Sequence, residues 1–243
     1  MLKVSFIGFR RHAALLRNIF NQKKNIKIYK IFSKTKINNS KYIFCKSISE
    51  LMDSDVIVIA SPTDFHYEHI LKLSNFKGYI FCEKPIVGSK LEINRLNKNN
   101  KLNISNFYTN FNFIFNKLND LIKKIHLSKK FGKIIKINIH ISHASALKKS
   151  WRKEWRLNTK SKLGPLETTG IHYIDMVRNL FGNIQLIDSY HFSQLKLREI
   201  DTSDVFFKSP EILFNFRFSY CESPRIYFFI IFKNGYAEYD GLK

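Results

Sequence analysis

Cysteine is scarce in this sequence, and the spacing of the cysteines argues against a disulfide framework or a cysteine metal site. Three cysteines, Cys45, Cys82 and Cys221, stand far apart among the 243 residues. An odd and widely spaced set predicts neither a disulfide framework nor a metal cluster. We therefore expect no metal site, and the free thiols fit a reducing cytoplasm.

Long apolar runs are also absent. No stretch reaches the roughly 18 apolar residues that a membrane-spanning helix needs. The longest apolar run near the end, residues 226–232, has the length of a strand. The first residues enter a strand at once, and Arg10 and Arg11 soon interrupt it, which is not the pattern of a signal peptide. We expect no membrane partner.

Acidic residues are few. The chain has 19 Asp and Glu against 41 Lys and Arg, and its formal net charge is +22. A strongly basic protein can bind nucleic acid through the phosphates. Here the lysines are dispersed over nearly every segment, and neither an arginine-rich arm nor a nucleic-acid module is recognisable. A general richness in Lys, Asn, Ile and Phe explains the charge more simply, so we expect no nucleic-acid partner.

The first part of the chain alternates between strand and helix patterns. We expect strands at residues 2–7, 25–32, 56–60 and 78–82, and helices at residues 12–21, 47–52 and 66–73. Such alternation predicts right-handed βαβ units and a parallel sheet, hence an α/β fold. We assign residues 1–106 to a dinucleotide-binding domain of the Rossmann type.

After residue 106 the pattern changes to runs of strands. We expect helices at residues 114–127 and 165–180, a strand at 133–145, and further strands at 184–192, 205–207, 212–220, 225–232 and 236–239. Consecutive strands favour a mostly antiparallel sheet. We assign residues 107–243 to a second, α+β domain for substrate binding and oligomerisation.

A dinucleotide-binding loop is expected between the first strand and the first helix. In the fingerprint, the first glycine makes a tight turn, the second lets the backbone approach the diphosphate, and the third, often alanine, allows close helix packing. Gly8 and Ala13 fit the outer positions, whereas Arg10 stands at the middle one. The Arg10 side chain either blocks the diphosphate or meets it as a cation. We assign Gly8, Phe9, Arg10 and Arg11 to the cofactor.

The end of the second strand bears on the choice of cofactor. An acid that binds the ribose hydroxyls is expected there, about 20 residues after the loop. The chain has Ser33 and Lys34 instead. A lysine favours a 2′-phosphate, and hence NADP over NAD. The alternative is an ordinary turn on a lysine-rich surface.

Two residues are candidates for the chemistry. Lys84 follows the apolar run 79–82 and is fixed by Pro85. A lysine in that position is a poor core residue and a good site residue. His172 lies on the helix expected at 165–180, and its ordinary pKa of about 6.5 suits proton transfer near neutral pH. The alternatives are a solvated lysine and a structural histidine.

Several short motifs occur in order along the chain. They are Ala60-Ser61-Pro62-Thr63 followed by His66, Glu83-Lys84-Pro85, Asn106-Phe107-Tyr108, Trp155-Arg156 before Leu163-Gly164-Pro165, and Gly170-Ile171-His172-Tyr173-Ile174-Asp175. Through these motifs the chain resembles, along nearly its whole length, the glucose-fructose oxidoreductase and inositol dehydrogenase family (Gfo/Idh/MocA). The tripeptide Glu83-Lys84-Pro85 is the most specific of them.

The resemblance implies a fold and a reaction. It implies an N-terminal Rossmann domain, a C-terminal domain with an open-faced sheet, and a cytoplasmic homo-oligomer that packs through that sheet. It also implies hydride transfer between NADP, or NAD, and a hydroxyl-bearing carbon. We expect a small sugar-like substrate, and surface glycan synthesis is our hypothesis for the pathway.

The resemblance also implies site residues. Lys84 would orient the substrate hydroxyl, and His172 would be the general acid and base. Thr168 and Asp175 would meet the substrate. The remaining residues that would meet the cofactor are Ser61, Pro62, His66, Glu83 and Arg156.

Departures from the family pattern support a second hypothesis. Besides Arg10 in the loop, Thr168 stands where the family often has aspartate, and the chain stops soon after Tyr239, where most relatives continue. The alternative is a degenerate, non-catalytic member that acts as a regulatory or scaffold subunit. His66 and His69 lie three residues apart on an expected helix, but no Cys, Asp or Glu cluster accompanies them, so we expect no metal there either.

Overall fold

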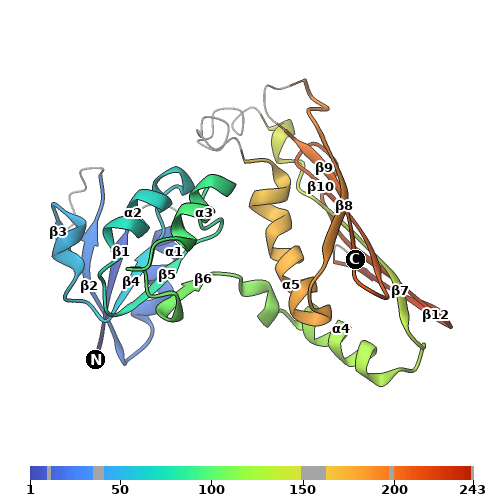
Figure 1. Ribbon diagram of the computed structural model, residues 1–243, viewed down its shortest axis with the longest axis horizontal. Coiled ribbons are helices and arrows are strands. Elements are labelled where there is room, and N and C mark those ends of the chain that lie inside the picture. The colour runs from blue at the N-terminus through green and yellow to red at the C-terminus, as the bar shows by residue number, and fades with distance from the viewer. Residues whose placement is uncertain (10–11, 35–40, 149–162, 197–199, 242–243) are drawn as a thin grey trace. The chain divides into compact units, whose positions relative to one another are not determined.

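The chain forms two compact units. The computed structural model describes residues 1–9, 12–34, 41–148, 163–196 and 200–241. The units are Met1–Asn110 and Phe111–Lys243, and each is described by itself. Among the described residues, each unit contains one six-stranded sheet (Figure 1). Within the same residues, no helix has both the length and the apolar character needed to cross a membrane.

The first unit is a parallel sheet with helices on both faces. The strand order is β3-β2-β1-β4-β5-β6, and every neighbouring pair is parallel. Its elements are β1 (Leu2–Ile7), α1 (His12–Asn21), β2 (Ile26–Phe32), β3 (Ile43–Cys45), η1 (Ile48–Leu51), β4 (Val56–Ile59), η2 (Thr63–Phe65), α2 (His66–Lys72), β5 (Tyr79–Cys82), α3 (Lys90–Asn97), η3 (Ile104–Asn106) and β6 (Phe107–Thr109). This order confirms the predicted Rossmann-type sheet.

The central strands of this sheet are apolar because both faces are covered. Val4 and Phe6 of β1 pack with Leu16 of α1 on one face. Ile57 and Ile59 of β4 pack with residues of η1, α2 and α3 on the other face. The covered faces bury the middle of the strands and leave their carboxyl ends at the edge of the sheet, where the loops emerge.

The second unit is a mixed sheet with two helices on one face. The strand order is β12-β11-β7-β10-β9-β8. Its elements are η4 (Asn112–Phe115), α4 (Lys117–Ser128), β7 (Ile134–Ser142), η5 (Ser145–Leu147), η8 (Leu166–Gly170), α5 (Ile171–Phe181), β8 (Gln185–Phe192), β9 (Thr202–Lys208), β10 (Leu213–Ser219), β11 (Arg225–Phe232) and β12 (Gly235–Asp240). β7 and β10 pair in parallel, and the other neighbours are antiparallel. The prediction of a mostly antiparallel sheet is confirmed.

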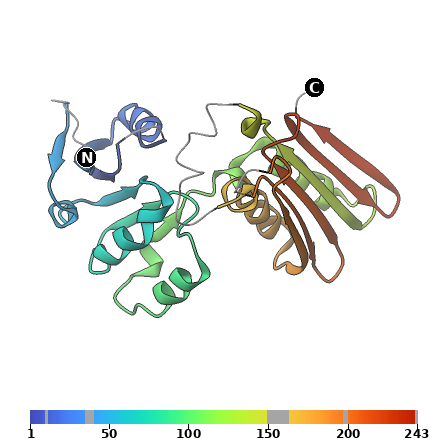
Figure 2. The same cartoon turned by 90° about the horizontal axis from the view of Figure 1, so that it is seen from above.

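The helices α4 and α5 lie on one side of this sheet (Figure 2). Alternate residues of β7 and β10 are buried toward the helices, in a core that includes Ile139, Phe216 and Phe218 of the strands and Met176 of α5. The intervening residues of β7 and β10 face the other side of the sheet, which no helix among the described residues covers. The sheet is therefore open-faced, as the resemblance implies.

Two predicted helices differ from those observed. The helix expected at residues 165–180 consists of a π-helical turn, η8, followed by α5. The helix expected at 114–127 begins only at Lys117, because the side chain of Asn116 accepts a hydrogen bond from the Leu118 amide at 3.0 Å and caps the helix there. The capping side chain therefore sets the start of this helix, which the spacing of apolar residues alone places too early.

Candidate active site

The first candidate region is the carboxyl edge of the parallel sheet in the first unit. The strand order reverses between β1 and β4, and in open α/β sheets the crevice at such a point is the usual ligand site. The loops after β1 and β4 are joined there, because the Ala60 amide donates to the Ile7 carbonyl at 2.9 Å. The Glu83 amide in turn donates to the Ile59 carbonyl at 2.9 Å. The turns that begin at Gly8, Ala60 and Glu83 therefore lie in one row.

Gly8 is required by close packing in this row. Its φ is +109°, and a Cβ atom there would lie 2.6 Å from the Ala60 carbonyl oxygen. No other residue fits without moving the backbone. The neighbouring Phe9 ring packs on Phe44, with a centroid distance of 5.3 Å, so only the backbone of Phe9 is left for a cofactor. Arg10 and Arg11 lie outside the described residues.

Arg17 holds the loop after β1 in place, a role that we did not predict. Its Nη2 donates to the Phe9 carbonyl at 2.7 Å, and its guanidinium lies 4.0 Å from the Phe9 ring centroid. Burial lowers the pKa of Arg17, although interactions with Tyr42 oppose the shift. The available signal was an arginine at the fourth residue after Ala13, on the apolar stripe of α1.

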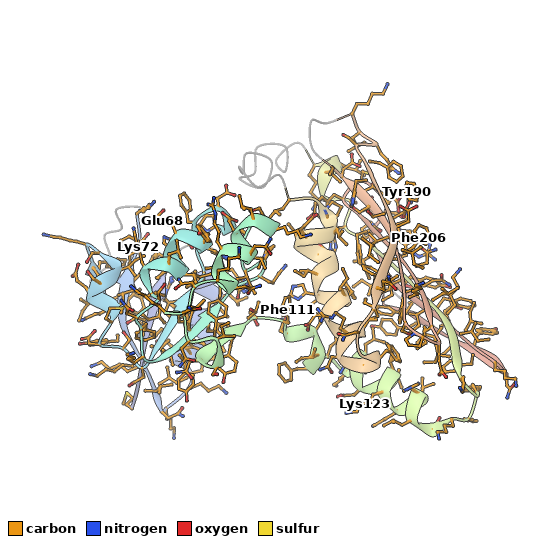
Figure 3. The ribbon with its side chains drawn as sticks, viewed as in Figure 1. Glu68, Lys72, Phe111, Lys123, Tyr190 and Phe206 are labelled. Carbon is orange, nitrogen blue, oxygen red and sulfur yellow. The ribbon has the colours of Figure 1, made fainter. Side chains whose placement is uncertain are left out.

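The end of β2 carries positive charge and no carboxylate. Lys34 is exposed, and its Nζ lies 4.4 Å from the Phe65 ring centroid. Ser33 is half-buried beside it. A hollow of about 340 Å³ adjoins the strand end and is lined by Phe32, Lys46, Ser47, Ile48, Ser49 and Lys72. Two polar groups of this lining are paired with carboxylates, since the Ser47 hydroxyl donates to Glu50 Oε1 at 3.0 Å and Lys72 Nζ donates to Glu68. The bond between Lys72 and Glu68 is 2.6 Å long and lies on the outer side of α2 (Figure 3).

The His66 imidazole lies between two loops of the first unit, and the cofactor contact expected of His66 stays a prediction. His66 is 1% exposed. Its Nε2 lies 2.8 Å from the Ser61 carbonyl oxygen, and its Nδ1 lies 2.9 Å from the Pro85 carbonyl oxygen. Burial lowers the pKa of His66, although the two hydrogen bonds act to raise it. The imidazole therefore ties together the two loops that contain Ser61, Pro62 and Lys84.

His69 lies one turn further along α2. Its Nδ1 is 3.0 Å from the Ser61 hydroxyl oxygen, and its ring stacks on Phe65. Burial, with the nearby His66, lowers the pKa of His69 to about 4. Among the described residues no group of three His, Cys, Asp or Glu side chains is placed to hold a metal ion.

Glu83 forms bonds within the first unit. Its side chain is buried, and Oε1 accepts from Asn110 Nδ2 at 2.7 Å. The same oxygen lies 2.9 Å from Nε2 of His12, the first residue of α1. This bridge engages one oxygen of the Glu83 carboxylate, and the predicted contact of Glu83 with the cofactor stays a prediction. The bridge links the cofactor loop to Lys84, which is half-buried and precedes a cis peptide bond to Pro85.

A second candidate region, in the second unit, surrounds His172 on α5. The imidazole is buried, with 9% exposed. The Phe113 ring stacks on it, with 4.4 Å between centroids and 11° between planes. The Phe111 ring meets it edge-on at 6.3 Å. Lys84 belongs to the first unit and His172 to the second.

The two predicted substrate residues differ from each other. Thr168 donates from Oγ1 to the Gly164 carbonyl at 2.9 Å, and this oxygen also contacts the Tyr220 hydroxyl. These contacts hold its hydroxyl at the π-helical turn, and the contact of Thr168 with substrate stays a prediction. Asp175 is half-buried one turn beyond His172, and burial raises its pKa against the charge of Arg178. Trp155 and Arg156 lie outside the described residues.

Two family models match the chain. Residues 2–103 match the model described as an oxidoreductase family with an NAD-binding Rossmann fold. Residues 120–238 match the model described as the GFO/IDH/MocA C-terminal domain. The two matches cover one unit each.

Individual proteins are similar over large parts of the chain. A glucose-6-phosphate 3-dehydrogenase of Bacillus subtilis is 28% identical over 195 residues, which are 74% of this chain and 54% of the relative. The chain thus spans about half the length of the curated relatives that it matches. The structure of myo-inositol 2-dehydrogenase from Lactobacillus plantarum superimposes with a TM-score of 0.80 at 20% identity, over 98% of this chain and 76% of the other.

A further structure is that of the WlbA dehydrogenase from Bordetella pertussis in complex with NADH and UDP-GlcNAcA. It has a TM-score of 0.83 at 15% identity and covers 99% of this chain and 79% of its own. At these identities the structural likeness establishes the fold.

Proposed function

Because the chain belongs to the GFO/IDH/MocA oxidoreductase family, we propose that it transfers hydride between a nicotinamide cofactor and a hydroxyl-bearing carbon of a sugar. The observation that carries this proposal is the carboxyl edge of the first sheet. There Gly8, the Ser61 loop and the Lys84 loop meet at the point where the strand order reverses. That point is where open α/β sheets bind dinucleotides.

The first unit would hold the cofactor, which supplies or accepts the hydride when bound. Gly8 fits the tight turn, and the backbone of Phe9 with Arg10 and Arg11 would meet the diphosphate. Lys34, with Ser33, would meet a 2′-phosphate, so we propose a preference for NADP. The charge at the end of β2 and the lack of a carboxylate at residues 32–34 support this preference.

Two side chains would interact with the substrate oxygen. During oxidation the substrate's hydroxyl proton would pass to a ring nitrogen of His172, and the cofactor, when bound, would accept the hydride from the carbon. Lys84 would donate a hydrogen bond from Nζ to the same oxygen and stabilise its developing negative charge. In reduction the proton returns from His172. Asp175 would contact another part of the substrate, and Arg156 would meet the cofactor or an anionic group of the substrate.

The substrate proposal is a hexose or a derivative of one. The Bacillus relative is a glucose-6-phosphate 3-dehydrogenase, and an Escherichia coli relative with 24% identity is a D-glucoside 3-dehydrogenase. These names support a sugar carbinol as the reacting group. A nucleotide-linked sugar of surface glycan synthesis is the narrower form of the proposal.

We propose that the protein acts as a homo-oligomer in the cytoplasm and that copies pack through the open face of the second sheet. Tyr190 and Phe206 lie on that face, on the side away from α5 (Figure 3), with their ring centroids 6.3 Å apart. Arg217 is at its centre and bonds Asp204 at 2.6 Å and Glu222 at 2.9 Å. Aromatic residues and arginine are enriched in surfaces that another protein covers.

The experiment that tests the function measures thermal stability with NADP, with NAD and with neither. A ligand at about 100 times its dissociation constant adds about 2.7 kcal/mol to the free energy of unfolding. We expect a larger shift with NADP than with NAD, and Lys34→Ser should reduce the difference. Reduced nicotinamide should then accumulate when glucose 6-phosphate, a glucoside or myo-inositol is added with the cofactor. If neither cofactor shifts the thermal unfolding transition at millimolar concentration, the protein is a non-catalytic scaffold.

A further inference from the structure

We propose that Phe113 is a positioning residue for His172, which it holds in one plane and whose protonated form it stabilises. The catalytic role of His172 rests on the function proposed above. The contact between the two rings does not, because it lies entirely within the second unit. Nothing in the family motifs that led to His172 points to Phe113.

The geometry is that of a stacked pair. The ring centroids are 4.4 Å apart and the planes are inclined by 11°, so one face of the imidazole is covered by the face of Phe113. The Phe111 ring stands perpendicular to the imidazole, with 89° between the planes. The Tyr173 ring in turn meets Phe113 at 90° and 5.0 Å. Turning the imidazole out of its plane about the Cβ–Cγ bond would break the stack, so the stack holds the plane of the ring.

Stacking leaves proton transfer open. Both nitrogens of an imidazole carry their hydrogen or lone pair in the plane of the ring. A phenyl ring over the face therefore covers carbon and nitrogen π density and leaves the in-plane directions to other groups. Phe113 can thus hold the ring without competing for the proton that His172 would exchange with the substrate.

The stack also favours the charged form. The face of a phenyl ring is the negative end of its quadrupole, and a cation within about 6 Å of the centroid is attracted to it. Burial works in the opposite direction, because desolvation disfavours the imidazolium. An aromatic partner therefore keeps a buried histidine able to take up a proton, which a general base must do in each turnover.

Few titratable side chains on the described elements packed against His172 compete with this effect. Residues 111–115 carry none. On the same helical stretch are Glu167, which accepts from the Gly164 amide at 2.9 Å, the phenol of Tyr173, Asp175 and the exposed Arg178. The charged residues of α4, which packs beside α5, are Lys117, Asp120, Lys123 and Lys124, together with His126, and all are exposed. These groups stay in place when only Phe113 is changed.

The test is an NMR titration of the His172 imidazole in the full chain, with the resonance assigned by its loss in His172→Gln. Phe113→Leu keeps an apolar side chain and removes the π face. We expect it to lower the pKa of His172 by about 0.5 to 1 pH unit. Phe113→Tyr keeps the ring and should leave the pKa near the wild-type value. Phe115→Leu is the matched control, because Phe115 is in the same turn and is 83% exposed.

Activity provides a second readout. With the best sugar of the panel, the rising limb of kcat/KM for oxidation should move to lower pH in Phe113→Leu by the same amount, and Phe113→Tyr should restore it. If Phe113→Leu does not fold, Phe113→Met removes the π face with a more flexible side chain. An unchanged His172 pKa in a folded Leu or Met variant overturns the proposal. A shifted pKa in a protein that oxidises no sugar upholds the pairing and refutes only the proposed function.

Discussion

Gly8 is the residue at which the carboxyl edge of the first sheet is packed most tightly. We predict that Gly8→Ala lowers the free energy of unfolding by clearly more than about 1 kcal/mol, because it adds a steric clash to backbone strain at positive φ. Gly182→Ala is the matched control, since Gly182 has φ +80° and no neighbouring atom within 4 Å of the added Cβ. Urea unfolding of both variants measures the difference. Equal losses would show that the close approach to Ala60 is unimportant.

His69 makes stability depend on pH. Burial lowers its pKa to about 4 in the folded chain, whereas the ordinary value is 6.5. Between these values the unfolded chain binds more protons than the folded one, so the free energy of unfolding falls as the pH drops from about 6.5 to about 4. The full effect is about 3 kcal/mol at most.

The variant His69→Gln removes this proton uptake. Urea unfolding at about pH 7 and about pH 4.5 should show a smaller loss in the variant than in the wild type. Some loss will remain, because burial also lowers the pKa of His66. The same loss in both proteins would mean that His69 is protonated equally in the folded and unfolded chains.

Sequence patterns locate the site residues along the chain better than they identify their partners. Gly8 and Lys84 were expected just after strands, and they lie just after β1 and β5. The bonds of Glu83 to His12 and Asn110 and those of His66 to two carbonyls were not predicted, because the tertiary fold brings these groups together. Lys84 and His172 keep their proposed roles as predictions.

The turn before α5 determines where His172 lies. Alanine normally stabilises a helix interior relative to glycine by about 0.5–1 kcal/mol. At Gly170, however, a Cβ would lie 2.6 Å from Cε2 of the fully buried Phe218. We predict that Gly170→Ala destabilises the protein by about 1–3 kcal/mol through overpacking.

A double-mutant cycle with Phe218→Leu measures this contact. The smaller side chain makes room for the new methyl group, so the double variant should lose less stability than the sum of the single variants. Strict additivity would place the cause of any destabilisation elsewhere in the helix.

Most strands were predicted from the sequence, whereas the helix α3 and the three-residue strands β3 and β6 were missed. Strands β1, β4 and β11 are apolar and β7 alternates, so each gives a clear pattern. Strands β3 and β6 have three residues each, too few to show a period. They are the two edge strands of the first sheet, and they form by pairing with the strands beside them. The π-helical turn was predicted as ordinary helix, because its extra residue depends on packing against β10 rather than on its own composition.

At the scale of the whole molecule, the open face of the second sheet should control assembly. We predict that Phe206→Lys shifts the protein toward monomers, because it places a charge among rings that a second copy would bury. Lys123→Glu is the control, since Lys123 is an exposed residue of α4, on the helical side of the sheet (Figure 3). Sedimentation velocity over a range of concentrations measures the change. A monomeric wild type would refute assembly through this face.

The central claim is that a nicotinamide bound by the first unit exchanges hydride with a sugar carbon whose oxygen contacts Lys84 and His172. The most direct measurement follows the absorbance of reduced nicotinamide with NADP and the sugar panel, in the wild type, Lys84→Ala and His172→Ala, alongside cofactor affinity by calorimetry. We predict turnover in the wild type, at least about 100-fold slower turnover in each variant, and cofactor affinity that changes little. Absence of cofactor binding in the wild type, or equal turnover in all three proteins, would contradict the claim.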